Sequence, residues 1–92
     1  MNPGAIRGNH YHQNKNEWFF LAQGTVELLL RDITAQKDIV KTLTATKPEV
    51  VAIPAGTAHA LKNSHSDPAL IIAYIDREFD PNQPDTYPMN LI

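Results

Sequence analysis

Three residues near the start of the chain have side chains that bind divalent metals. His10 and His12 stand two positions apart, and Glu17 follows five positions after His12. Neutral imidazoles and carboxylates suit zinc, iron and manganese, but a site needs several that converge. If this stretch is a β-strand, side chains two positions apart point to one face, so His10 and His12 converge. Glu17 can join them if residues 13–16 turn the chain back.

A fourth ligand must come from elsewhere, and two histidines remain in the sequence. His59 follows the turn signal Pro54-Ala55-Gly56, which can aim the next strand toward the site. His65 lies in a polar run that we predict to be a loop, where a histidine is ordinarily solvated. A lone buried histidine is usually a satisfied core residue, whereas several imidazoles with a glutamate at this spacing favour metal binding.

Short runs of branched and aromatic residues recur along the chain between turn residues, with no clear helical period. The predicted strands are Ala5 to His12, Glu17 to Ala22, Thr25 to Arg31, Asp38 to Leu43, Glu49 to Ile53, Ala58 to Lys62 and Ala69 to Ile75. Many short strands at this spacing indicate a sandwich or barrel. We therefore expect one all-β domain over residues 1–92. Residues 79–92 should form an extended tail because Pro81, Pro84 and Pro88 interrupt pairing.

The predicted strand from Glu17 to Ala22 is apolar on both faces. Phe19 shares the face of Glu17, whereas Trp18 and Phe20 take the opposite face. A strand that is apolar on both sides is buried on both sides. A domain this small buries only about 60–65% of its unfolded surface and is marginal alone. We therefore predict that the second cover is another copy of the chain, in a homodimer.

Composition excludes several functional classes. The eight Lys and Arg residues form no run and the formal net charge is −2, so nucleic acid is not an expected partner. The absence of cysteine removes disulfides, thiolate zinc sites and cysteine nucleophiles. No apolar run approaches the roughly 20 residues of a membrane span, and the first residues lack the apolar run of a signal peptide. We expect a cytoplasmic protein.

Two blocks of sequence resemble the two motifs of the cupin superfamily. They read Gly4-x5-His10-x-His12-x4-Glu17-x6-Gly24 and Pro54-x-Gly56-x2-His59-x3-Asn63. Pro48 stands where the second motif usually begins with glycine, which concerns a turn and no ligand. The resemblance implies a small β-barrel of jelly-roll type, usually dimeric. It also implies that the metal ligands are His10, His12, Glu17 and His59.

A narrower resemblance covers nearly the whole chain. Its segments are Arg7-Gly8-Asn9-His10-Tyr11-His12, Lys15-Asn16-Glu17, Lys47-Pro48-Glu49-Val50-Val51, Phe79-Asp80-Pro81 and Pro84-Asp85-Thr86-Tyr87. They are similar to the C-terminal cupin domain of bifunctional capsular-polysaccharide enzymes. The resemblance implies zinc binding and C3 epimerisation of a UDP-linked 4-keto-6-deoxy sugar. In those enzymes an N-terminal dehydrogenase-like domain reduces the ketone. Here no Gly-rich dinucleotide fingerprint is present, and an early strand upstream of the first motif is expected to be absent.

Two further residues are predicted to contact the substrate. Arg7-Gly8-x-His10 also resembles the rhamnose-pathway 3,5-epimerases, in which the arginine contacts substrate phosphates. Tyr74 would line the cavity if its strand face points inward. The catalytic base is unknown, and the candidates are Lys15, Tyr74 and Asp76. In the metal-free rhamnose epimerases the histidine matching His10 is itself the base, but the other three ligands favour metal binding by His10.

Together these features predict a metal-dependent epimerase or isomerase. It would act next to the 4-keto group of a nucleotide-activated deoxysugar in polysaccharide biosynthesis, with a separate reductase as a partner. Zinc suits this role because it has no redox chemistry and can keep an open coordination position. The same ligands also accommodate iron, manganese or nickel, so a dioxygenase-type cupin is one alternative. The other is a non-catalytic module that binds a sugar or nucleotide sugar.

Overall fold

The computed structural model describes residues 1–92, which form eight β-strands and no helix. The strands are β1 (Ile6–Tyr11), β2 (Glu17–Gln23), β3 (Thr25–Asp32), β4 (Asp38–Thr44), β5 (Val50–Ile53), β6 (Thr57–Lys62), β7 (Leu70–Ile75) and β8 (Tyr87–Pro88). The all-β prediction is confirmed, and β1 to β7 match the seven predicted strands to within one residue at each end. No helix in the structure has the length and apolar character that crossing a membrane would require.

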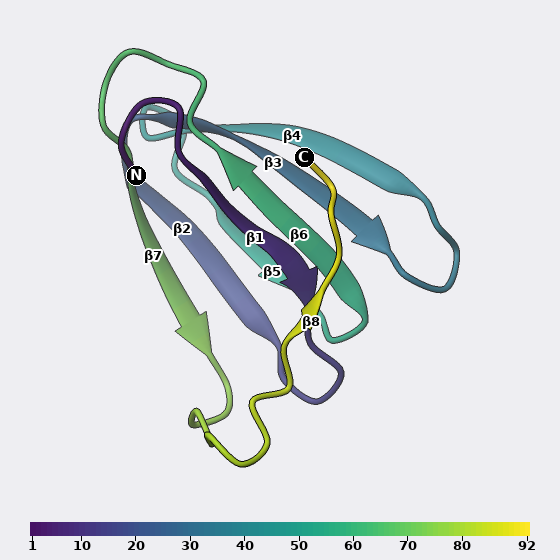
Figure 1. The fold of residues 1–92 in the computed structure, drawn as a ribbon. Helices are drawn as coiled ribbons and strands as arrows, with labels where there is room; N and C mark the ends of the chain where they lie inside the picture. Colours follow the sequence, from purple (N-terminus) through teal and green to yellow (C-terminus); the bar gives the residue numbers. More distant parts are fainter.

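The strands form two antiparallel sheets that face each other. The larger sheet has the order β4-β3-β6-β1-β8, and the smaller has the order β5-β2-β7. Figure 1 shows these two layers and the C-terminal segment, which passes beside the end of β1. That segment was expected to be irregular throughout, but Tyr87 and Pro88 pair with β1 as an edge strand. Proline is tolerated there because an edge strand need not donate a hydrogen bond on its outer side.

The core lies between the two sheets. It consists of Phe19, Leu21, Val26, Leu28, Leu43, Ile53, Leu61 and Ala69. In β2 the inward residues Phe19 and Leu21 are buried, whereas Trp18 and Phe20 on the outer face are only half-buried. The period-2 pattern of β2 therefore has the predicted geometry, and nothing in this single chain covers its outer face completely.

A β-bulge in β1 sets the position of the histidines. Gly8 pairs with Ala60, and the next pairing joins His10 to His59, so Asn9 is an extra residue in the strand. Gly8 and Asn9 have φ angles of 90° and 56°. Glycine is required at position 8 because a Cβ atom there would lie 2.7 Å from the carbonyl oxygen of His59. The bulge thus places His10 directly beside His59 on the neighbouring strand.

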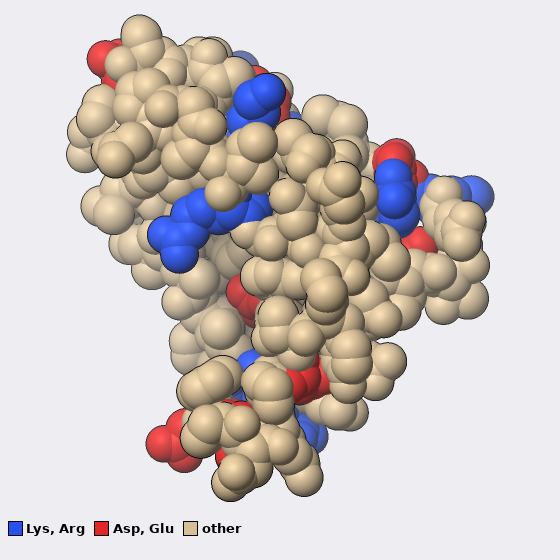
Figure 2. Space-filling model, in the orientation of Figure 1, with Lys and Arg blue, Asp and Glu red and all other residues tan.

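Charged side chains show no concentration of one sign on the face of the molecule in Figure 2, where Lys and Arg are interspersed with Asp and Glu. One ordered pair on the larger sheet joins Arg31 to Asp38, with 2.6 Å between Nε and Oδ1. A second joins Lys41 to Glu49 at 2.9 Å. Such exposed pairs contribute little to stability because solvent screens them.

Candidate metal centre

Four side chains from three strands and one loop converge between the sheets. His10 comes from β1, His59 from β6 and Glu17 from the start of β2, while His12 follows the end of β1. One potential ligand atom from each lies within 4.8 Å of those of the other three. All but the half-buried His10 are buried. The structure therefore brings together the four residues that the motif resemblance implied as metal ligands.

The distances are close to those of a metal site. The imidazole centroids of His10 lie 5.0 Å from His12 and 4.6 Å from His59. Glu17 Oε1 lies 2.5 Å from His12 Nε2 and 3.8 Å from His59 Nε2. Zinc binds imidazole nitrogen and carboxylate oxygen at about 2.0–2.2 Å, so two ligand atoms of one ion lie at most about 4.4 Å apart. Small side-chain rotations would bring all four atoms within reach of one ion.

The tautomer of His12 indicates what belongs between it and Glu17. His12 Nδ1 lies 2.6 Å from the carbonyl oxygen of Asp85, and a carbonyl can only accept, so Nδ1 carries a proton. In the neutral imidazole, Nε2 then presents a lone pair to the carboxylate of Glu17. Glu17 Oε1 is buried and has no hydrogen bond, although His12 Nε2 is so close. Two lone pairs that face each other at this distance repel, and either a proton or a metal ion shared between the two atoms relieves that repulsion.

The histidines are held in the form that binds metals. Burial, followed by the neighbouring His10 and His12, lowers the pKa of His59 from 6.5 to about 4. Burial and the charge of His12 likewise lower the pKa of His10. A neutral imidazole has the free lone pair that ligation needs. His59 Nε2 is the ring nitrogen that faces the carboxylate of Glu17.

Three members of the cluster, His10, Glu17 and His59, line a cavity of about 310 Å³. Its full lining comprises Met1, Arg7, Gly8, His10, Glu17, Phe19, His59, Leu61, Leu70, Ile71 and Ala73. The exposed Arg7 belongs to this lining, and its contact with substrate phosphates stays a prediction. Apart from Arg7, the titratable side chains of the lining are His10, Glu17 and His59.

Tyr74 and Asp76 are not brought to the cavity. The side chain of Tyr74 is on the outer face of the smaller sheet, 65% exposed, with its ring 5.6 Å from that of Trp18. Its neighbour Ala73 lines the cavity instead, because successive side chains alternate across a strand. The Asp76 carboxylate accepts hydrogen bonds from the backbone and side-chain amides of Asn16. Substrate binding by Tyr74 therefore finds no support in this arrangement and stays a prediction.

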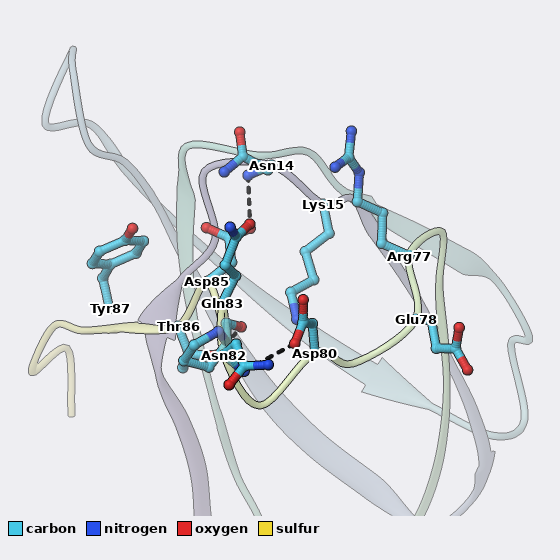
Figure 3. A pocket seen from close by; sticks show the side chains of 11 residues that line it. Asn14, Lys15, Arg77, Glu78, Asp80, Asn82, Gln83, Asp85, Thr86 and Tyr87 are labelled. Atoms are coloured by element: carbon cyan, nitrogen blue, oxygen red, sulfur yellow. Dashed lines mark hydrogen bonds between the residues drawn. The ribbon is translucent and has the colours of Figure 1, made fainter.

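Lys15 is buried, with 7% of its surface exposed, but it lines a different cavity. This second cavity has a volume of about 750 Å³ and lies between the β1–β2 loop and residues 77–87. Figure 3 shows the Lys15 side chain extending from the loop into the space bordered by these residues. Its ammonium nitrogen lies 5.7 Å from the centre of the Phe79 ring. A role of Lys15 as proton carrier stays a prediction.

His65 and Asn63 have structural surroundings. His65 is in the predicted loop, where its half-exposed ring lies 3.5 Å from Glu27 Oε1. It is not part of the metal cluster. Asn63 is fully buried and donates hydrogen bonds to the carbonyl oxygens of Met1 and Asp67. Its own side-chain oxygen accepts from the backbone of His65, so this motif residue organises the turn.

Two residues that the sequence did not single out hold the ligand segments in place. Asn16 donates to Asp76, and its side-chain oxygen accepts from the backbone of Ala55, so the loop beside Glu17 is tied to two other segments. Asp85 contacts His12 from the C-terminal segment. The sequence signal for these roles is only that Asn16 and Asp85 are short polar residues, which often cap loops.

The chain is similar to curated proteins of polysaccharide and nucleotide-sugar metabolism. It is 31% identical over 85 residues to a UDP-2-acetamido-2,6-beta-L-arabino-hexul-4-ose reductase of Pseudomonas aeruginosa, covering 92% of this chain and 23% of that protein. It is 28% identical over 88 residues to the spore coat polysaccharide biosynthesis protein SpsL of Bacillus subtilis, covering 90% of this chain and 58% of SpsL. The chain thus spans about a quarter of the first relative and rather more than half of the second.

Solved structures show the same fold. The capsular polysaccharide assembling protein CapF of Staphylococcus aureus matches with a TM-score of 0.93 and 35% identity, over 99% of this chain and 26% of CapF. A dTDP-4-dehydrorhamnose 3,5-epimerase of Sulfolobus tokodaii matches with a TM-score of 0.83 and 20% identity, over 99% of this chain and 55% of the epimerase. The second likeness concerns the fold alone. These neighbours confirm the predicted cupin fold, a small barrel of jelly-roll type.

A family model covers almost the whole length of the chain. The match extends over residues 1–87 and includes both halves of the metal cluster, the β1 region with Glu17 and the β6 region with His59. The chain belongs to the polysaccharide biosynthesis C-terminal domain family.

Proposed function

We propose that this chain is a metal-dependent epimerase or isomerase that acts next to the 4-keto group of a nucleotide-activated deoxysugar in polysaccharide biosynthesis. The observation that carries the proposal is the pair of lone-pair atoms, His12 Nε2 and Glu17 Oε1, which face each other beside a cavity at 2.5 Å. The similarity to the reductase of P. aeruginosa and to CapF supports the substrate class.

We propose His10, His12, Glu17 and His59 as the residues that hold the metal. With three imidazoles and one carboxylate the donor set fits zinc, and it also fits iron, manganese or nickel. A bound metal would supply a Lewis acid for the ketone oxygen. The buried position of the cluster excludes bulk water, which strengthens every electrostatic interaction with charge that develops on the substrate.

The cavity suits a sugar ring with a charged group outside it. Its volume of about 310 Å³ is at the lower end of small-molecule sites. Six of its 11 lining residues are hydrophobic, which suits the less polar face of a deoxysugar. Arg7 is the one cationic side chain of the lining and is exposed, so we propose that it contacts the phosphates of the nucleotide.

The base that removes the carbon-bound proton is the open part of this proposal. The cavity lining offers no titratable side chain besides Arg7 and the cluster itself. Of the cluster, His10 is the most exposed, and burial keeps it neutral by lowering its pKa. His10 is therefore the group that could leave the ligand set and act as base, with His12, Glu17 and His59 retaining the metal. A His10→Gln variant that keeps its metal but loses proton exchange would assign this role.

Proton exchange tests the enzymatic proposal. The protein would be incubated in heavy water with a UDP-linked 4-keto-6-deoxy sugar, with and without a chelator. We expect deuterium at the carbon next to the ketone, and we expect the chelator to abolish it. His65→Ala serves as the matched control, because His65 lies outside the cluster and should leave the exchange unchanged. No uptake by a protein shown to contain metal would contradict the proposal.

A non-catalytic sugar-binding module is the second candidate, because the cavity lining contains no base outside the ligand set. Saturable binding of the nucleotide sugar without any exchange would support it. Oxygen consumption with a redox-active metal would instead support a dioxygenase-type cupin. For the epimerase, the ketone remains after the reaction, so we propose that a reductase acts next on the product.

We also propose that the chain forms a homodimer through the smaller sheet. Trp18, Phe20, Val50, Ile72 and Tyr74 share the outer face of this sheet by their pairing registers. Val50, Ile72 and Tyr74 are 65%, 54% and 65% exposed. A contiguous apolar surface of this kind favours a protein interface, and a second copy is the partner that a small domain with a limited core needs.

A further inference from the structure

The C-terminal segment makes one hydrogen bond to a side chain of the proposed metal cluster. The carbonyl oxygen of Asp85 accepts a hydrogen bond from His12 Nδ1 at 2.6 Å, although the two residues are 73 positions apart. From this geometry we infer that Asp85 is a positioning residue, which fixes the tautomer and the orientation of His12 for metal binding. The inference rests on the proposed metal centre and adds the group that prepares one of its ligands.

The Asp85 side chain holds its own carbonyl in place. One carboxylate oxygen accepts from the backbone of Gln13 at 2.9 Å, and the other accepts from the backbone of Asn14 at 2.8 Å. Figure 3 shows this contact between Asp85 and Asn14 at the rim of the second cavity. Burial alone would raise the pKa of Asp85, but the two backbone N–H groups outweigh it and lower the pKa, so the carboxylate stays charged. Asp85 thus contacts three consecutive residues, His12 through its carbonyl and Gln13 and Asn14 through its carboxylate.

The backbone of Asp85 adopts a conformation that serves this double contact. Its φ angle is 51°, in the left-handed region where aspartate and asparagine are tolerated better than most residues. Such a strained position persists only where the surrounding contacts fix it. The bonds to Gln13 and Asn14 supply that fixation, and they turn the carbonyl of Asp85 toward His12.

The segment beyond Asp85 is anchored independently of this loop. Tyr87 pairs with Tyr11, and their rings stack with centroids 5.2 Å apart. The side-chain oxygen of Asn9 accepts from the backbone of Leu91 at 2.9 Å, and the carbonyl of Asn9 accepts from the backbone of Met89 at 2.8 Å. Asn9, the bulge residue of β1, therefore fixes the C-terminal segment that carries Asp85. Because the chain is fixed on both sides of Asp85, its carbonyl can orient the imidazole of His12.

The consequence for His12 follows from donor and acceptor roles. Since the carbonyl of Asp85 cannot donate, it selects the tautomer with a proton on Nδ1. Nε2 is then free to bind a metal beside Glu17. Partners of this kind, one contact removed from the ion, typically change metal affinity by about 10–100-fold. We expect an effect of that size for the loss of the Asp85 side chain.

Two substitutions at position 85 separate positioning from mere folding. Asp85→Gly keeps the positive φ angle without strain but removes both carboxylate bonds. Asp85→Asn keeps one acceptor oxygen and also tolerates the positive φ angle. Zn²⁺ affinity would be measured by competition with a chromophoric chelator. We expect affinity about 10-fold or more weaker for Asp85→Gly, and a clearly smaller loss for Asp85→Asn.

The second readout is the protonation of His12, from the nitrogen chemical shifts of its ring in the chelator-treated protein. Wild type should show a proton fixed on Nδ1, and Asp85→Gly should show a mixture of tautomers. Unchanged affinity and an unchanged tautomer in Asp85→Gly, even with a lower melting temperature, would overturn the inference. If wild type itself binds no Zn²⁺, the proposed metal centre fails, whereas the tautomer still decides whether Asp85 positions His12.

Discussion

At the scale of single residues, protons and metal ions would compete for the lone pairs of the clustered imidazoles. His59 is 2% exposed and packs edge-on against Phe19 with ring centroids 5.2 Å apart. An imidazolium ion at this position would lie in a low-dielectric site beside two other imidazoles. The fold therefore opposes protonation and leaves the lone pairs available. A bound metal ion would be stabilised by the negative charge of Glu17, whose Oε1 lies 3.8 Å from His59 Nε2.

His59 provides the first prediction at this scale. His59→Ala should weaken Zn²⁺ binding by more than about 100-fold, because loss of a direct ligand exceeds the loss of an outer partner. The variant should also melt at a lower temperature, with a loss of about 1–3 kcal/mol from the cavity that it leaves. Metal content after gel filtration and thermal melts would check both. His65→Ala is the control, and full occupancy in His59→Ala would remove His59 from the ligand set.

The lowered pKa of His59 predicts how the metal-free protein responds to pH. An unfolded histidine titrates near 6.5, whereas folded His59 titrates near 4. Between these values the unfolded state binds more protons, so the stabilisation is complete above pH 6.5 and is lost as pH falls toward 4. We expect the free energy of unfolding to be about 2 kcal/mol lower at pH 5 than at pH 7. His10 adds a contribution of the same sign.

Urea unfolding of the chelator-treated protein at the two pH values would check this response. His59→Leu should flatten the pH dependence, whereas His65→Ala should retain it. Several aspartates also have lowered pKa values, but they titrate below 3.8 and so outside this window; they are Asp32, Asp38, Asp76 and Asp85. A stability that does not change between pH 7 and pH 5 would argue against the burial of a neutral His59.

At the scale of elements, the strands were predictable and the bulge in β1 was not. Strand parity placed His10 and His12 on one face, and this held because the extra residue, Asn9, precedes both histidines. A bulge one position later would have separated them. The sequence contains Gly8 but gives no sign that a bulge forms there. The requirement for glycine becomes visible only in the fold, where the backbone of His59 on another strand approaches position 8 closely.

The same reasoning explains why the contacts of the C-terminal segment, residues 79–92, were not predictable. The prolines predicted an extended, irregular tail, and irregular segments have no period from which contacts such as the pairing of Tyr87 and Pro88 with β1 can be read. The bond between Asp85 and His12 joins residues 73 positions apart and uses a backbone carbonyl, which every residue possesses. Likewise, β7 was predicted with the right bounds, yet whether Tyr74 faced the cavity required the register of β7 against β2. The sequence identifies which residues can bind a metal or a substrate, whereas the direction of their side chains depends on how the two sheets assemble.

The bulge provides a prediction at the scale of elements. Gly8→Ala should destabilise the protein by at least about 1–3 kcal/mol and weaken Zn²⁺ binding, because its Cβ would displace the backbone of His59. Gly4→Ala has a similar φ angle of 82° but no atom within 4 Å of the new Cβ, so it reports the cost of the backbone conformation alone. Gly24→Ala meets the carbonyl of Pro68 at 2.7 Å, far from the cluster in the pairing scheme.

Chemical unfolding and Zn²⁺ competition on these three variants would separate the effects. We expect Gly8→Ala and Gly24→Ala to lose more stability than Gly4→Ala. Only Gly8→Ala should also lose affinity once each variant is compared under conditions where it is folded. Equal Zn²⁺ affinity in Gly8→Ala and Gly24→Ala would show that the bulge does not set the ligand geometry.

At the scale of the whole molecule, the two sheets differ in how they meet solvent. The larger sheet is extended at its β1 edge by the C-terminal segment (Figure 1). The smaller sheet presents Trp18, Phe20, Ile72 and Tyr74 on its outer face, where Ile72 and Tyr74 are 54% and 65% exposed. Since β2 also carries Glu17 on its inner face, a partner packed on this sheet would stiffen the strand that supplies a metal ligand. Association and metal binding are therefore expected to support each other.

Dimer formation through the smaller sheet is the prediction at this scale. Ile72→Lys would place a charge on the apolar face, next to the central strand β2, and should convert a dimer into a monomer at micromolar concentration, as measured by light scattering. Val40→Lys on β4 is the matched control, because Val40 is 69% exposed but belongs to the other sheet. If Val40→Lys dissociates the protein and Ile72→Lys does not, the interface lies on the larger sheet. A wild-type monomer at the same concentration would contradict the proposal, and the half-buried Trp18 and Phe20 would then be a solvent-exposed face that the domain tolerates alone.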